Sequence, residues 1–194
     1  MRKEMVDSQL PSGSQQNQTG SDSRVERQLS SSTFSRDIIV GLAGGLAGTI
    51  AMHVFGVGIF LVMGQPTSIS FSIIGDATAS FFARLGVELA GGAPLGMVVF
   101  YLLGLALGVT FVALVLRIDA LRLDSIKKGV GLGILYVEAL SLPLLATATL
   151  VLEMTAAATA LWFGISVVMH LVYGVVMGAV VSYGLRPAAA ATRG

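Results

Sequence analysis

Apolar residues in this chain of 194 residues are gathered into four long runs separated by more polar segments. An α-helix rises about 1.5 Å per residue, so a run of roughly 20 apolar residues covers the hydrocarbon core of a bilayer. We predict membrane spans at about 38–63, 97–116, 130–152 and 162–183. The predicted fold class is therefore all-α, an integral membrane bundle of four transmembrane helices.

The connection between the first two spans, residues 64–96, has a different pattern. Apolar positions such as Phe71, Ile74 and Phe81 recur at roughly helical spacing among polar ones such as Asp76 and Arg84. The segment is too polar to cross a membrane. We predict a short amphipathic helix that lies at the membrane surface, and the alternative is a lid over a cavity.

Both ends of the chain lack such runs. Residues 1–36 are rich in Ser and Gln and poor in large apolar residues, so they cannot bury enough surface to offset the entropy of ordering. They also lack the apolar region of a secretory signal peptide. We predict a disordered tail over 1–36, a transmembrane domain over 37–186 and a short tail over 187–194.

Composition and charge support this interpretation and add an orientation. Charged residues make up 12% of the chain and hydrophobic ones 54%, far from the balance of a water-soluble domain. Of the twelve basic residues, all but Arg84 fall on one side of the predicted membrane. The positive-inside rule makes that side cytoplasmic, so we expect a cell-membrane protein with both termini in the cytoplasm.

Small residues recur every fourth position in two of the spans, which places them on one helix face. The stripe of span one is Gly41, Gly45, Thr49 and His53, and the stripe of span four is Ser166, His170, Gly174, Gly178 and Ser182. Small residues let helices approach closely. We predict that spans one and four pack antiparallel with the two stripes facing each other, through the packing residues Gly41, Gly45, Thr49, Gly174, Gly178 and Ser182. The two histidines would then lie at the same depth.

Three ionisable residues lie within the spans, namely His53, Glu138 and His170. With Tyr173 they form a candidate intramembrane polar site, because ionisable groups in a membrane are costly and face the bundle interior. One interpretation is structural: the histidines bond to backbone carbonyls or to hydroxyls such as those of Thr49 and Ser166, and an uncharged Glu138 bonds to Tyr173 or Tyr101. A proton or ion pathway and a b-type haem held by the two histidines are the alternatives.

No motif of a soluble enzyme is present. The sequence holds no H-E-x-x-H, no nucleophile elbow and no nucleotide fingerprint, and it lacks cysteine altogether. We therefore expect no enzymatic activity, no cofactor, no metal and no nucleic-acid partner.

The segments GLAGGLAGTIAM near residue 41 and MHLVYGVVMGAVVSYG near residue 169 resemble a family of small prokaryotic proteins with four spans, frequent in archaea and of unknown function. Members share a glycine-rich first helix and a His-x-x-Tyr-Gly element, here His170, Tyr173 and Gly174. The resemblance covers roughly residues 38–185 and implies a four-helix membrane fold without implying an activity.

These observations favour a multi-pass membrane protein that is structural or accessory to a membrane partner, with the lipid bilayer as its surroundings. A small transporter or channel subunit acting as an oligomer is the alternative, and a haem-binding electron carrier is a weaker one.

Overall fold

The chain folds into helices, as seen in a computed structural model that describes residues 16–186, and the side chains of residues 34–186. The elements in chain order are α1 (Gln16–Val62), α2 (Ile69–Ala83), α3 (Ala93–Arg117), the 3₁₀ helix η1 (Asp119–Leu121), α4 (Ile126–Val151) and α5 (Ala156–Gly184). Within the described residues, four stretches are long and apolar enough to cross a membrane: Phe34–Val62, Ala93–Arg117, Ile126–Val151 and Ala156–Gly184. The predicted fold class is confirmed.

The helices extend beyond the predicted spans where capping residues allow it. α5 begins six residues earlier than predicted, and the Thr155 side chain accepts a hydrogen bond of 3.3 Å from the Ala158 amide at its start. α3 begins after Gly92, which has φ of 83°, and Pro94 stands in its first turn. Hydropathy alone does not register these starts because alanine and proline are only weakly apolar.

The structure begins α1 at Gln16, within the segment predicted to be a disordered tail, and the disorder of residues 1–36 stays a prediction. Adding residues to an existing helix avoids the cost of nucleation, so a polar segment can continue a helix that an apolar segment has started. Contacts nevertheless separate residues 1–36 from residues 37–194 as two units. The predicted tails at 1–15 and 187–194 lie outside the described residues.

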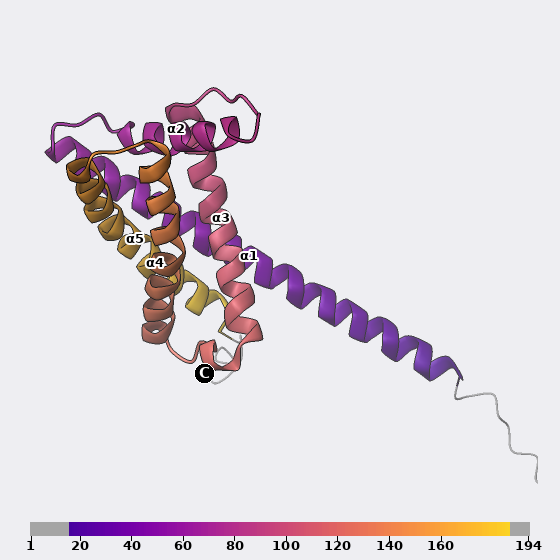
Figure 1. The fold of residues 1–194 in the computed structure, drawn as a ribbon. Helices are drawn as coiled ribbons and strands as arrows, with labels where there is room; N and C mark the ends of the chain where they lie inside the picture. Colours follow the sequence, from indigo (N-terminus) through magenta and orange to yellow (C-terminus); the bar gives the residue numbers. More distant parts are fainter. Residues whose placement is uncertain (1–15, 187–194) are drawn as a thin grey trace, which may run out of the picture. The chain divides into compact units, whose positions relative to one another are not determined.

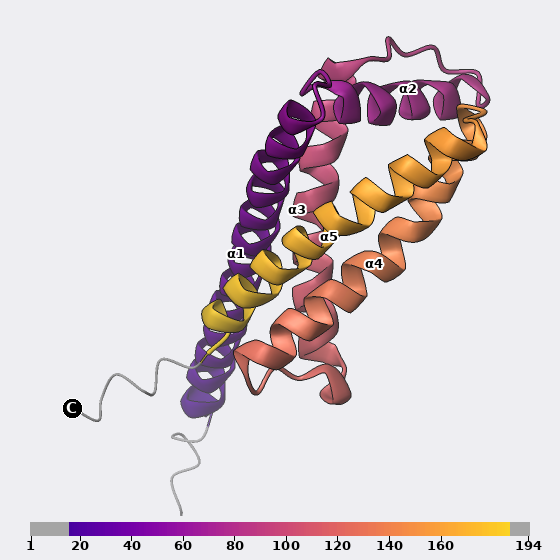
Figure 2. The same cartoon turned by 90° about the vertical axis from the view of Figure 1, so that its left-hand side faces the viewer.

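From residue 37 onward, neighbouring helices run antiparallel (Figure 1, Figure 2). α1 packs against α3 along one face and against α5 along another, while α4 and α5 form a hairpin. The core lies among these helices and is built from Phe111, Val137, Met169, Met177 and Val181, all of them buried.

The predicted helix between spans one and two is α2, which lies across the ends of the transmembrane helices (Figure 2). It sits directly on the start of α3, since a Cβ added at Gly96 would overlap the Phe71 carbonyl oxygen of α2, and one added at Gly75 would overlap the carbonyl oxygen of Gly92, just before α3. Asp76 fixes the connection by accepting a hydrogen bond of 2.7 Å from the Gly92 amide. α2 therefore closes one end of the bundle, which we call the α2 end.

Candidate functional site

The two small-residue stripes do not face each other, so that prediction was wrong. Gly41 and Gly45 of α1 lie against α3: a Cβ at Gly41 would come 2.8 Å from Val109 Cα, and one at Gly45 would overlap the Gly104 carbonyl oxygen. Gly174 of α5 lies against α4 instead, where a Cβ would come 2.7 Å from Ile134 Cα. Each stripe packs against a pair of glycines in a different helix. The partners are Gly104 and Gly108 for α1, and Gly129 and Gly133 for α5.

α1 and α5 do pack together, through a neighbouring face of each. A Cβ at Gly44 would come 2.6 Å from Val181 Cγ2, and one at Gly48 would come 3.0 Å from the Tyr173 ring. Further along, Gly56 lies against Met169. This antiparallel register places His53 and His170 at about the same level, as expected, but on stripes that point toward different helices.

Tyr173 joins three helices at the centre of the bundle. Its ring, only 3% exposed, rests against Gly48 of α1, and its hydroxyl donates a hydrogen bond of 2.6 Å to the Gly104 carbonyl of α3. Thr49, 1% exposed, packs against Gly104 and donates to the Gly45 carbonyl of its own helix at 2.8 Å. Tyr173 is therefore engaged with backbone and does not bond Glu138.

His53 belongs to an aromatic cluster beneath α2. Its Nδ1 forms a hydrogen bond of 3.0 Å with the Tyr101 hydroxyl, and the direction of that bond depends on the tautomer. The Phe71 and His53 rings form a T-shaped pair with a centroid distance of 4.9 Å, and Phe100 packs against Phe71 at 5.3 Å. Tyr101 thus replaces the predicted backbone and Thr49 partners of His53. Sequence reasoning placed Phe71 on the apolar side of the helix at 64–96 but not beside His53, and it missed Phe100, because aromatic residues are equally common facing lipid.

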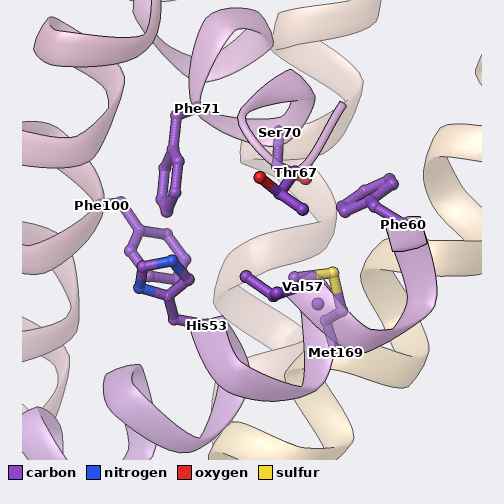
Figure 3. Close-up of a pocket in the computed structure, with 9 residues that line it drawn as sticks. His53, Val57, Phe60, Thr67, Ser70, Phe71, Phe100 and Met169 are labelled. Carbon is purple, nitrogen blue, oxygen red and sulfur yellow. The ribbon is translucent and has the colours of Figure 1, made fainter. Parts of the chain in front are cut away.

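A small cavity opens beside this cluster (Figure 3). Its volume is about 10 Å³, close to the minimum that holds one water molecule. It is lined by His53, Gly56, Val57, Phe60, Thr67, Ser70, Phe71, Phe100 and Met169.

Glu138 and His170 form the other polar region, between α4 and α5. Both carboxyl oxygens of Glu138 and Nδ1 of His170 are shielded from solvent and have no hydrogen-bond partner among the described residues. Gly174 lies against Ile134, and one turn further along each helix come His170 and Glu138, so the two residues lie at about the same level. Side chains lean toward the N-terminus of their own helix. Since these helices are antiparallel, the two side chains lean apart, which accounts for the lack of a direct bond.

The four candidate residues are therefore divided rather than gathered. His53 lies in the cluster beneath α2, Tyr173 joins α5 to α3, and Glu138 and His170 lie at about the same level on α4 and α5 without a bond between them. In the part of the chain that the structure describes, no three His, Asp or Glu side chains lie close enough together to hold a metal ion.

Four apolar helices, closed at one end by a short fifth, define the class as a multi-pass membrane bundle. Residues 35–191 match the model of a family of unknown function, DUF6789, and the chain belongs to this family. The resemblance to a family of unknown function is thus confirmed. Comparison with curated proteins and with solved structures finds no match.

Proposed function

We propose that this chain is a non-enzymatic accessory or structural subunit that acts through association with a partner in the membrane. The observation that supports this is the way in which its helices meet. At Gly41 and Gly45 against α3, and at Gly174 and Gly178 against α4, backbone lies directly on backbone. Helices this close leave no space between them for a solute to pass, whereas a rigid bundle is well suited to support a neighbour.

The test is to purify the full chain from its native membrane in a mild detergent and to reconstitute it alone into vesicles. We expect the native preparation to run as an assembly larger than the 20.1 kDa chain and to contain a second kind of polypeptide. The reconstituted chain alone should show no flux of protons or ions above that of empty vesicles. A flux that depends on the chain would contradict the proposal.

A second candidate function is a proton- or ion-transporting subunit, and Glu138 and His170 support it. Ionisable groups within a membrane often mark functional sites. The polar atoms of these two side chains are shielded from solvent and have no hydrogen-bond partner among the described residues. The transport assay distinguishes the two candidates: flux in the reconstituted chain that falls in Glu138→Gln, but not in the exposed-residue control Glu88→Gln, would establish this second function.

Haem binding gains no support from the geometry of the histidines. His53 lies on a stripe directed to α3, with Nδ1 bonded to Tyr101, while His170 lies on a stripe directed to α4. Bringing both onto one iron would require the helices to repack. We propose that the purified protein is colourless, and a Soret band lost in both His53→Ala and His170→Ala would contradict this.

For orientation, we propose a cell-membrane protein with both termini in the cytoplasm, on the strength of the eleven-to-one distribution of basic residues. Reporter fusions at the two ends measure this directly. A C-terminus on the external side would overturn it.

A further inference from the structure

The cavity beneath α2 carries polar groups on two of its sides. His53 comes from α1, while Thr67 and Ser70 come from the link and the first turn of α2 (Figure 3). The remaining lining is apolar or aromatic. The cavity is therefore a place where one helix offers a ring nitrogen and another offers hydroxyls.

Ser70 is the group that most needs a partner. Its side chain is 8% exposed, and its Oγ is shielded and has no hydrogen-bond partner among the described residues. A buried hydroxyl left unpaired is energetically costly, because it has lost its bonds to water without replacement. Thr78 of the same helix does not share this feature, since it donates to the Ile74 carbonyl at 2.7 Å.

His53 supplies the complementary group. Its Nδ1 is taken up by Tyr101, so Nε2 is the ring nitrogen left for a partner in the cavity. Whichever way the bond to Tyr101 runs, a neutral ring offers either a donor or an acceptor at Nε2. A hydroxyl such as that of Ser70 is complementary to both.

We propose that this cavity binds a single water molecule that bridges His53 Nε2 and Ser70 Oγ. The volume of about 10 Å³ is close to the minimum that holds one water molecule, and such a water needs two or more polar partners, which His53 and Ser70 offer in the lining. Exposed Thr67 stands at the lining and gives the water a way in from the α2 end. The water completes a hydrogen-bonded chain of Tyr101, His53, water and Ser70 that ties α3 and α1 to α2.

The chain offers a clean measurement because it contains only two histidines. With histidine labelled in ¹³C and ¹⁵N in detergent micelles, we expect the carbon-bound Hε1 and Hδ2 of His53, which flank Nε2 in either tautomer, to show magnetisation transfer from the bound water. Tyr101→Phe identifies His53, since it should shift Nδ1 of that ring and leave the water transfer in place. Ser70→Ala should shift Nε2 and abolish the transfer, whereas the control Thr78→Ala should change neither.

Two results would overturn the proposal. One is the absence of water transfer to His53 in the unaltered protein, a measurement that needs no variant to fold. The other is a Ser70→Ala protein in which the Nε2 signal and the water transfer match those of Thr78→Ala. Thermal unfolding of each variant establishes that the compared proteins are folded.

Discussion

The half of the bundle nearest the α2 end and the half nearest η1 are held together in different ways. Near η1, glycines place backbone on backbone, as at Gly41 with Gly108 and at Gly129 with Gly178. Toward α2, side chains fill the space between the transmembrane helices, with the His53 ring on one side and Glu138 on the other, and glycine contacts there are confined to α2 against the start of α3. Tyr173 and its bond to Gly104 mark the boundary between the two.

The difference separates the contacts that set the distances between helices from the side chains that still have unpaired hydrogen-bonding atoms. A glycine contact admits one helix separation only, because any added atom meets a backbone that cannot move aside locally. A polar contact tolerates exchange of partners, and in this half Ser70, Glu138 and His170 retain unpaired atoms. We therefore expect substitutions near η1 to act on stability, and substitutions toward α2 to act on hydrogen bonding and on function.

The largest effect should come from Gly45→Ala in the glycine half. The new Cβ would overlap the Gly104 carbonyl oxygen and force α1 away from α3. Overpacking of this kind costs roughly 1–3 kcal/mol, and contact with backbone places it at the upper end. The control is Gly58→Ala, which meets nothing within 4 Å and should be neutral or slightly stabilising. Equal unfolding free energies for the two variants in mixed micelles would contradict the claim that glycine contacts near η1 determine stability.

The polar half should respond to Glu138→Leu with a gain in stability. Removing two shielded oxygens that have no partner relieves a penalty of about 1–3 kcal/mol, and leucine suits a membrane interior. The measurement is the unfolding free energy in micelles, with Glu88→Leu on the exposed link as the control. A clear loss of stability in Glu138→Leu would mean that the carboxyl group does have a partner in the membrane.

The boundary between the halves is tested by Tyr173→Phe. This change removes one hydroxyl and its bond to the Gly104 carbonyl, for an expected cost of about 1 kcal/mol. Tyr183→Phe is the matched control, because Tyr183 is 72% exposed and no comparable loss should follow. If both variants unfold alike, the bond across α5 and α3 contributes nothing measurable.

The smallest effect should follow from deleting residues 1–36. These residues form a unit separate from the transmembrane domain, so the unfolding free energy should change by less than about 0.5 kcal/mol. Membrane insertion and thermal unfolding of the truncated chain are the measurements. A marked loss in either would show that both halves of the bundle depend on the tail.

The sequence by itself determined the class of the protein. Runs of some 20 apolar residues leave a helix as the structure that satisfies its own backbone in lipid, so the four spans and the shorter helix at 69–83 follow from length and hydropathy. It also identified the residues that needed special surroundings, since glycines in a span and ionisable groups in a membrane both require protein contacts. The sequence-based prediction missed the ends of the helices, because capping residues rather than hydropathy determine where a helix begins.

Only the tertiary structure decided which helix meets which. The stripe of Gly41 and Gly45 could fit any glycine pair of matching spacing, and the sequence offers such pairs in three other spans. The stripe of Gly41 and Gly45 packs against α3, and the stripe of Gly174 and Gly178 packs against α4. The two histidines therefore lie at about the same level but do not contact each other. A periodic pattern specifies a face but not its partner, because partner choice depends on the summed packing of all the helices.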